Sequence, residues 1–484
     1  MTLFKKLSNS STSWFSIGMS GIFMLSVALR FWGLGRFNAL VFDEVYYAKF
    51  ANNYLTGTHF FNAHPPLSQY IIAIGMWLGS HLPFGQDTVN GLTGSLRSTW
   101  SYRWLNALTG SFIPLVVGAL AYQLNQRRSY AFIAALFAAA DGLFLVESRY
   151  ALNNVYLVIL GLLGQLCFLV ALGQPKQQRG VSLAVSGIFF GASACIKWNG
   201  LWFLLGVYIV WVAAWVMQWV RSRVGSLEVR NTKLSQTRLA NLTQLNVLQI
   251  LWNFAIIPVV TYSLLWIPHL QMNPKPGFWQ AQHDILTFHE KIGSGPEVHP
   301  YCSKWYSWLL MWRPVAYFYQ TARNTTEQVP AYPPLPAGAG KVIYDVHAMG
   351  NPFLWWLSTA AIFLLLLLLT LRFLEGVGWK SPPTPHSWIA LYLVLNWLAN
   401  LLPWVRVTRC IFLYHYMGSS VFSGLALAWL VDRWLHSDEP HFRSAAVTII
   451  FLVLLAFVFW LPIYLGLPLP SQGYRFWMWF SSWI

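Results

Sequence analysis

The chain has 484 residues, of which 56% are hydrophobic and only 10% are charged, and its mean hydropathy is +0.48. This apolar content excludes a soluble globular protein and indicates a polytopic membrane protein, in which the abundant Trp and Phe residues anchor helices at the lipid interface. The formal charge of +16 does not indicate nucleic-acid binding, because the basic residues are scattered between apolar segments.

Eleven apolar runs are long enough to cross a bilayer, which takes about 20 helical residues. They cover residues 16–35, 103–124, 129–147, 151–172, 181–196, 198–219, 247–268, 351–373, 386–404, 411–431 and 445–466. Little more than "CIKWN" separates the fifth run from the sixth, and Lys197 and Asn199 there favour a tight turn. The first run lacks a small-residue cleavage site, so we expect a retained membrane anchor.

Lys and Arg residues concentrate in the connections on the side of the N-terminus, and few lie on the opposite side. Cytoplasmic loops are enriched in these residues, so the asymmetry predicts an N-terminus inside and a C-terminus outside. That orientation requires an odd number of spans. The basic stretch 220–246 lies inside in this arrangement, where we expect it to contact anionic headgroups.

Two long outer loops follow from this topology, at residues 36–102 and 269–350. Both contain too many aromatic residues to be disordered, and loops of this length are usually functional when they are ordered. The apolar run 67–82 is too short to span and fits an interfacial or re-entrant helix. We find no soluble domain and no internal repeat, so residues 1–484 are expected to form a single transmembrane domain.

The four cysteines have no CxxC spacing. Cys167 and Cys195 lie in apolar runs, where a small packing role is expected. A disulfide between Cys302 and Cys410 is one option, although the sequence alone does not bring these residues together.

Asp43 and Glu44 stand side by side in "NALVFDEVYYAKF", just after the first apolar run. They could be a solvated loop pair, part of a metal site with His64, or a catalytic base. The apolar and aromatic flanks favour a base, because partial desolvation raises the basicity of a carboxylate. No recognised metal-ligand spacing is present. Adjacent residues diverge on a helix or a strand, so the two carboxylates are expected to have different roles.

Several other charged or polar residues fall near the same outer face. They are Arg103, Glu147, Arg149, Lys197, Arg406, Arg409 and His415. Each could snorkel to the interface or pair with a carboxylate. Together, the cations suit recognition of a lipid phosphate. A sugar on such a phosphate has an anionic leaving group, so one base and a cation cluster suffice for an inverting transfer.

Ordered motifs connect these residues to a known family. The motifs are "RFWGLGRFNALVFDEVYYAKF", "HPPLSQYIIAIG", "YRWLNALTGSFIPL", "ESRYALNNVYLV", "ACIKWNGLW", "HPYCSKWYSWLLMWRPVAYFY" and "CIFLYHYMGS". In this order they resemble the motifs of bacterial-type protein O-mannosyltransferases. The resemblance implies an all-α polytopic GT-C glycosyltransferase in a bacterial plasma membrane. The implied reaction moves mannose from polyprenyl-phosphate-mannose to Ser or Thr of exported proteins at the extracytoplasmic face. We predict no cofactor, and we expect no metal because no set of metal ligands is visible in the sequence.

The resemblance also implies roles for individual residues. Asp43 matches the catalytic carboxylate with Glu44 as its support, and Arg103 and Lys197 match positions expected to bind the lipid phosphate. Further substrate-site candidates without assigned roles are His64, Glu147, Arg149, His289, His299, Tyr301, Arg409 and His415. Eukaryotic relatives carry a β-trefoil (MIR) insert in the second outer loop, and that loop is too short for one here.

Two alternatives stay open at this point. One is a GT-C transferase that uses another prenyl-phosphate sugar, or a lipid or glycan acceptor. The other is a transporter or flippase, which the number of spans fits. Carriers usually show paired repeats and broken helices at the midplane, whereas the polar residues here gather at one face.

Overall fold

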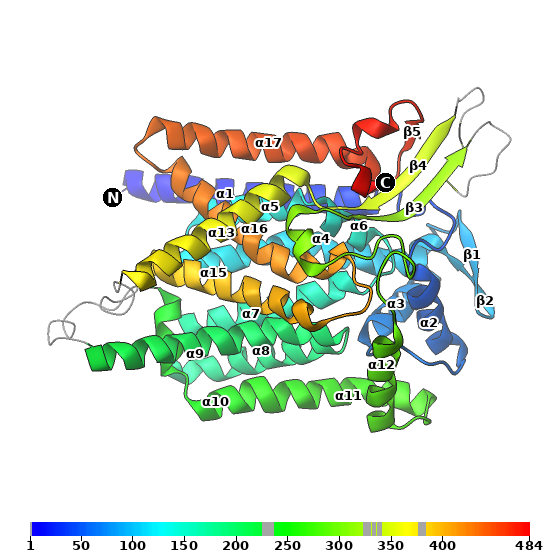
Figure 1. The fold of residues 1–484 in the computed structure, drawn as a ribbon, viewed down its shortest axis with the longest axis horizontal. Coiled ribbons are helices and arrows are strands. Elements are labelled where there is room, and N and C mark those ends of the chain that lie inside the picture. The colour runs from blue at the N-terminus through cyan, green and yellow to red at the C-terminus, as the bar shows by residue number, and fades with distance from the viewer. Residues whose placement is uncertain (1, 225–236, 323–330, 332–334, 336–340, 376–383) are drawn as a thin grey trace.

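The computed structural model describes residues 2–224, 237–322, 331, 335, 341–375 and 384–484. Long helices run side by side along the longest dimension of the molecule, and the N- and C-termini lie at opposite ends of this bundle (Figure 1). Short helices and two small β-sheets gather at the end where the C-terminus lies (Figure 1). We call this the outer end, after the orientation predicted from the sequence.

The bundle is built from helices whose bounds follow the apolar runs of the sequence. They are α1 (Thr2–Phe31), α4 (Thr99–Asn125), α5 (Arg128–Ala139), α6 (Gly142–Arg149), α7 (Asn154–Gly173), α8 (Arg179–Ala194), α9 (Leu201–Val224), α10 (Val247–Leu251), α11 (Ile257–Met272), α13 (Pro352–Leu374), α15 (Pro385–Leu401), α16 (Met417–Leu435) and α17 (Pro440–Leu465). A π-helical turn, Trp252–Ile256, joins α10 to α11.

Within the described residues, eight helices are long and apolar enough to cross a membrane, and a ninth span results if α5 and α6 count as one. That pair bends by 58°, because Asp141 caps a new helix by accepting hydrogen bonds from Leu143 N and Phe144 N. Each of the eleven predicted runs overlaps a helix. However, α8 has 16 residues, and neither it nor α16 is among the eight. The count of eleven spans stays a prediction.

Local sequence signals explain where several helices begin and end. The Ser98 side chain caps α4, and Asn351 caps α13, which opens with a proline. Gly466 ends α17 in the left-handed conformation, with φ of 61°. Between α8 and α9 the chain makes the tight turn that the sequence predicts at Lys197 and Asn199.

The outer end carries the two long loops. The first contains α2 (Glu44–Thr56), α3 (Leu67–Gly79) and a hairpin of β1 (Val89–Leu92) and β2 (Ser95–Ser98). The second contains α12 (Phe278–Lys291), β3 (Val315–Ala322) and β4 (Val342–Ala348). β4 pairs antiparallel with β3 and with β5 (Pro468–Pro470), so the C-terminal segment completes a three-stranded sheet. Helix α3 confirms the short apolar helix predicted at 67–82, whereas the sheets are absent from the all-α prediction.

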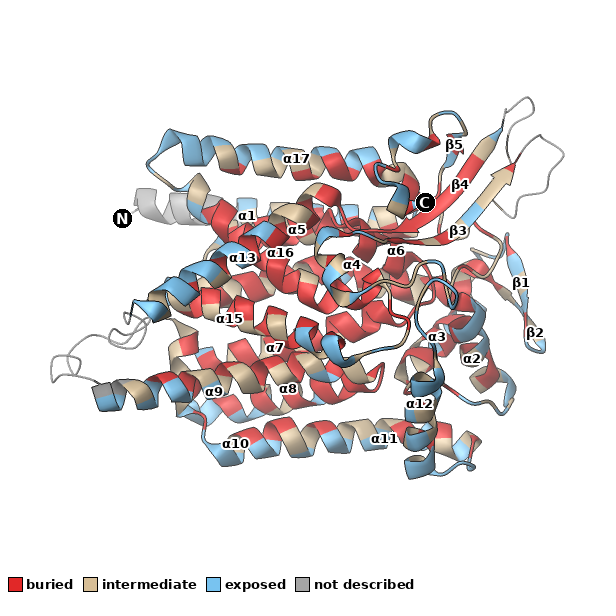
Figure 2. Ribbon diagram, viewed as in Figure 1, coloured by how far each residue is buried: buried red, intermediate tan, exposed pale blue. Residues whose placement is uncertain are grey.

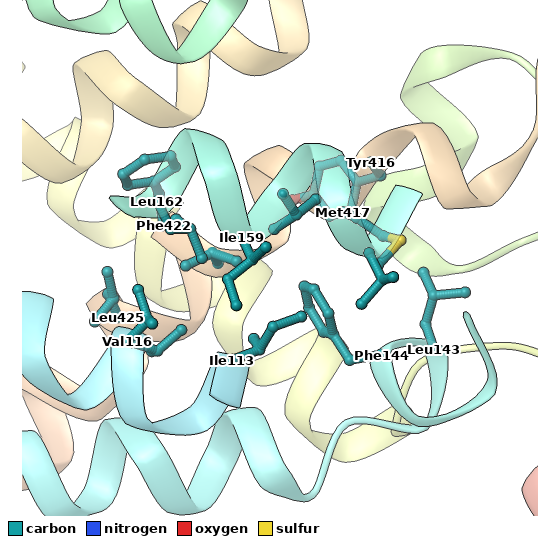
Figure 3. Packing of buried hydrophobic residues seen from close by; sticks show 14 of the residues in the cluster. Ile113, Val116, Leu143, Phe144, Ile159, Leu162, Tyr416, Met417, Phe422 and Leu425 are labelled. Carbon is teal, nitrogen blue, oxygen red and sulfur yellow. The ribbon is translucent and has the colours of Figure 1, made fainter. Parts of the chain in front are cut away.

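Burial is greatest along the middle of the bundle, and exposed residues cover the outward faces of α10, α11 and α17 (Figure 2). Figure 3 shows side chains of α4, α6, α7 and α16, and of the residue before α16, packed around one point of this core. The labelled residues are Ile113, Val116, Leu143, Phe144, Ile159, Leu162, Tyr416, Met417, Phe422 and Leu425. Within a membrane such packing holds helices together mainly by van der Waals contact. The predicted headgroup-binding stretch 220–246 includes residues 225–236, which lie outside the described residues.

Candidate active site

A cavity of about 500 Å³ opens at the outer end of the bundle. Its walls come from α2, the segment before α3, the turn between α8 and α9, helix α12, and the segment before α16. Six of the predicted site residues line it: Asp43, His64, Lys197, His289, Arg409 and His415. Much of the remaining wall is aromatic or aliphatic. Segments far apart in the sequence therefore bring a carboxylate, two cations and three imidazoles into one space.

Asp43 is the residue before α2, and its backbone leaves its carboxylate free to face the cavity. Its carbonyl accepts hydrogen bonds from Tyr46 N at 2.9 Å and Tyr47 N at 3.0 Å, but its side chain makes no capping bond. Aspartate in this position usually caps the helix. The preceding Phe42 has a φ of 51°, which non-glycine residues rarely adopt. This unusual turn directs Asp43 away from the helix end.

The surroundings of Asp43 suit a base. The side chain is partly exposed, but the exposure is to the cavity, and protein surrounds it elsewhere. Burial raises the pKa of Asp43 to about 6, against the opposing effects of the Lys197 charge and of a hydrogen bond with Tyr47. The carboxylate is therefore mostly ionised at neutral pH and more basic than a solvated aspartate.

Lys197 supplies a cation beside Asp43. Its ammonium donates a hydrogen bond to Asn154 Oδ1 at 3.0 Å and lies 5.5 Å from the centre of the Tyr414 ring. Burial lowers the pKa of Lys197, while the charges of Asp43 and Glu147 oppose that shift. Arg409 is the second cation of the cavity, and its guanidinium donates to Cys410 O at 3.0 Å.

The imidazoles of the cavity are neutral groups. The rings of His64 and His289 lie 5.1 Å apart, and Nε2 of His289 is 2.9 Å from Ala63 O. Burial lowers the pKa of His289 to about 4 and holds the pKa of His64 well below its usual range. At neutral pH these two side chains offer hydrogen bonds rather than positive charge. Within the described residues, no three His, Cys, Asp or Glu side chains are grouped as a metal site.

Glu44 and Arg103 form a buried ion pair outside the cavity lining. Arg103 donates to both carboxylate oxygens, at 2.9 and 2.8 Å, and both side chains are fully buried. Glu44 also accepts from Val41 N and Ala151 N, each at 2.8 Å. As predicted, the adjacent carboxylates of Asp43 and Glu44 diverge. Glu44 is thus saturated with hydrogen bonds and holds the start of α2 in place.

The expected phosphate contact of Arg103 does not fit this geometry. Its remaining donors bind the carbonyls of Leu34, Phe37 and Ala39 at 2.8–3.1 Å. Arg149 acts similarly just upstream, because its guanidinium donates to the carbonyls that end α1 and begin the next loop. Together these arginines fix the backbone between α1 and Asp43. A cation near a helix C-terminus is also favoured by the helix dipole.

Three other predicted residues lie near the cavity without lining it. Glu147 is buried, and it accepts hydrogen bonds from Tyr317 OH and from Asn154 Nδ2 at 3.1 Å. The ring of His299 meets the Phe412 ring edge-on at 5.0 Å. Tyr301 packs under the Arg313 guanidinium at 5.1 Å. These side chains support the walls of the site.

A disulfide joins Cys302 to Cys410, with their Cα atoms 5.2 Å apart. It connects the second outer loop to the segment that carries Arg409 and His415. Two backbone hydrogen bonds reinforce this junction, from Ser303 N to Ile411 O and from Cys410 N to Gly293 O. The pairing that the sequence left open is therefore formed, and it lies beside the cavity.

Sequence reasoning did not single out Tyr47, Asn154, Tyr317 or Tyr414. Tyr47 hydrogen-bonds with Asp43, and Tyr414 lies against Lys197. All four stand in the quoted motifs, but aromatic and amide side chains among apolar residues give no distinguishing pattern. Their partners are distant in the sequence, so only the fold reveals them.

Comparison with known proteins agrees with the motifs. Residues 20–271 match the family model described as dolichyl-phosphate-mannose-protein mannosyltransferase. Residues 274–483 match the model described as the C-terminal four TMM region of protein-O-mannosyltransferase. A polyprenol-phosphate-mannose–protein mannosyltransferase of Corynebacterium glutamicum is 24% identical over 96% of this chain and 92% of its own length.

Solved structures share the fold. A chain of the S. cerevisiae protein O-mannosyltransferase Pmt1–Pmt2 complex bound to the sugar donor superimposes with a TM-score of 0.77. It is 14% identical, and the match covers 97% of this chain and 92% of that chain. ArnT from Cupriavidus metallidurans, bound to undecaprenyl phosphate, gives a TM-score of 0.50 at 13% identity. That match covers 94% of this chain and 77% of ArnT.

Proposed function

The chain belongs to the dolichyl-phosphate-mannose-protein mannosyltransferase family, and from that premise we propose how it transfers mannose from a polyprenyl-phosphate carrier to protein. The acceptor we propose is a Ser or Thr hydroxyl of an exported protein, and the base is Asp43. The family match and the named relatives support the glycosyltransferase activity. The geometry of the cavity supports the assignment of the base.

One observation carries the assignment of Asp43. Within the described part of the chain, Asp43 is the one carboxylate that lines the cavity, and Lys197 and Arg409 line the same cavity. Phosphate on a lipid carrier is a good leaving group that requires cations rather than a general acid. A single base is then sufficient for the acceptor hydroxyl.

The proposed reaction is one displacement. Asp43 takes the proton of the acceptor hydroxyl as that oxygen bonds to the anomeric carbon of mannose. The bond from this carbon to the phosphate oxygen breaks, and its electron pair leaves with the lipid phosphate. Lys197 and Arg409 stabilise the charge that develops there, and Arg409 takes the place that we had expected for Arg103. Attack from the face opposite the phosphate inverts the anomeric carbon.

We further propose that the site lies on the extracytoplasmic face of a bacterial plasma membrane. The distribution of Lys and Arg supports this orientation. The Cys302–Cys410 disulfide lies at the same end as the cavity, and disulfides persist in oxidising compartments rather than in the cytosol. An exported polypeptide and a membrane-embedded lipid carrier would both reach a cavity at this surface.

The substitution Asp43→Asn tests the base. It keeps the size of the side chain but removes its ability to accept a proton, so we expect transfer of radiolabelled mannose to fall by at least about a hundredfold. Asp87→Asn is the matched control, because Asp87 is an exposed aspartate of the same outer loop. We expect both variants to insert and unfold like the wild type. Transfer by Asp43→Asn at the wild-type rate would refute the assignment.

The donor and acceptor need a separate experiment. Purified membranes should be supplied with a panel of polyprenyl-phosphate sugars and peptides with and without Ser and Thr. We expect mannose to be transferred, and only to peptides with a hydroxyl side chain. Preferential transfer of another sugar, or transfer to a lipid or glycan, would instead favour the second transferase activity considered from the sequence.

A further inference from the structure

Tyr317 occupies a bulge in β3, the edge strand of the outer sheet. In the pairing with β4, Ala316 lies opposite His347 and Phe318 lies opposite Val346, so Tyr317 is the extra residue between them. Bulges often occur next to active sites, where they change the direction of one side chain. This bulge buries Tyr317, whereas Tyr319, two residues further along the strand, is 53% exposed.

The ring of Tyr317 is stacked on Phe42, the residue before Asp43. The two ring centres are 4.2 Å apart, and the planes differ by only 7°. Phe42 holds the left-handed backbone conformation that directs Asp43 into the cavity. A non-glycine residue in this conformation is strained and persists only when its surroundings hold it. Tyr317 is the ring that stacks parallel to Phe42, while His299, Phe412 and Tyr414 meet it edge-on.

The hydroxyl of Tyr317 is connected to Lys197 through two buried side chains. It donates a hydrogen bond to Glu147 Oε1. Glu147 accepts from Asn154 Nδ2 at 3.1 Å, and this orients the amide so that Asn154 Oδ1 accepts from Lys197 Nζ at 3.0 Å. Asn154 and Glu147 lie behind Lys197, outside the cavity lining. The chain of hydrogen bonds therefore fixes the position of a cation that Tyr317 does not touch.

We propose that Tyr317 is a positioning residue that aligns both halves of the catalytic site. Its ring holds Phe42 and thereby aims Asp43 at the acceptor hydroxyl. Its hydroxyl, through Glu147 and Asn154, holds Lys197 toward the donor phosphate. This inference rests on the proposed function, and it makes the β3–β4 hairpin of the second outer loop part of the catalytic machinery.

Two substitutions separate the two roles. Tyr317→Phe keeps the ring and removes the hydroxyl, so we expect the KM for polyprenyl-phosphate-mannose to rise about tenfold, with a smaller change in kcat. Tyr317→Leu removes the stack as well, so kcat should also fall, by about ten- to a hundredfold. Tyr319→Phe and Tyr319→Leu are matched controls on the exposed side of the same strand, and we expect wild-type kinetics from them.

A rescue experiment distinguishes positioning from general stability. Glycine adopts a positive φ without strain. Adding Phe42→Gly to Tyr317→Leu should therefore recover part of the lost kcat, whereas a merely destabilised fold would lose more activity. Thermal unfolding of every variant is measured beside the kinetics.

The results of these experiments show whether a failure lies in the positioning role of Tyr317 or in the proposed function on which that role rests. If the wild type transfers mannose while both Tyr317 variants match the Tyr319 controls, the positioning role is wrong and the proposed function stands. The role is also wrong if Phe42→Gly lowers kcat further in the Tyr317→Leu background. A wild type that transfers no mannose to any hydroxyl peptide overturns the proposed function and this inference with it.

Discussion

Neighbouring residues of this site have opposite environments, and the difference determines their chemistry. Glu44 is closed off by Arg103 and two backbone amides, so its charge is fully compensated. Asp43, one residue earlier, makes no capping bond, hydrogen-bonds with Tyr47 and lines the cavity. Glu44 is therefore occupied by structural hydrogen bonds, whereas burial makes Asp43 a better base.

The raised pKa of Asp43 predicts how activity depends on pH. A base acts only when it is ionised, and burial raises the pKa of Asp43 to about 6. We therefore expect kcat/KM to be nearly constant just above pH 7 and to fall about tenfold for each pH unit below 6. A solvated aspartate, with an ordinary pKa of about 4, would keep its activity to much lower pH.

Initial rates of mannose transfer, measured from about pH 4 to about pH 8, test this expectation. Thermal unfolding at each pH is the control, because a loss of folded enzyme would imitate the titration. A rate that stays constant between pH 5 and pH 7 would show that the base has an ordinary pKa, or that it is another residue.

The sequence points to Asp43, Lys197 and the arginines as candidates, but it does not show which atoms they contact. The pattern placed Arg103 and Arg149 near Asp43 and Glu44, and both arginines do bond to the segment around them. The sequence does not reveal that both arginines donate to backbone carbonyls between Leu29 and Ala39. Tyr317 could not be recognised at all, because a bulge depends on the register of two strands and leaves no signal in either one.

The sequence predicted the helices more accurately than it predicted the contacts of single side chains. Apolar runs predicted the helices, because a lipid environment requires long apolar segments whose backbone hydrogen bonds are internal. The run 129–147 predicts one span, and the structure adds a bend at Asp141, where a capping carboxylate starts α6. The strands at the outer end escape prediction because β1 and β2 have only four residues each, and β4 is buried at almost every position, without the alternation of a half-buried strand.

The disulfide between Cys302 and Cys410 joins two structural elements, the second outer loop and the segment before α16. Cys410 is bonded next to Arg409, so the link holds a cavity cation as well as the loop. The 108-residue separation of the two cysteines implies a large loss of entropy in the unfolded chain when they are joined. We expect the variant Cys302→Ser with Cys410→Ser to lose about 2–5 kcal/mol of stability and to bind the donor more weakly.

Two measurements test this expectation in the wild type and in the double variant. They are thermal unfolding and the KM for polyprenyl-phosphate-mannose, each with and without a thiol reductant. Reductant should lower the unfolding temperature of the wild type and leave the double variant unchanged, so the variant also controls for other effects of the reagent. An enzyme whose stability and KM are the same in every arm would show that the link is dispensable.

At the scale of the whole molecule, the fold places all the chemistry at one end. The termini lie at opposite ends of the bundle, and α2 and α12 lie at the end of the C-terminus (Figure 1). Residues of these two helices line the cavity. Helix α8 runs from the far end to the turn that carries Lys197, and its 16 residues extend about 24 Å. A lipid-linked donor and a protein acceptor therefore have to meet on the same side of the membrane.

This arrangement predicts which surface faces out. Leu96 in the β1–β2 hairpin is 74% exposed at the cavity end, and Gln177 is exposed in the connection that precedes α8 at the far end. In a background with Cys167→Ser and Cys195→Ser, a membrane-impermeant maleimide should label Leu96→Cys in intact cells stripped of their outer layers. Gln177→Cys should be labelled only after the membrane is permeabilised. The reverse pattern would place the cavity in the cytoplasm, and the acceptor could then not be an exported chain on the far side of the membrane.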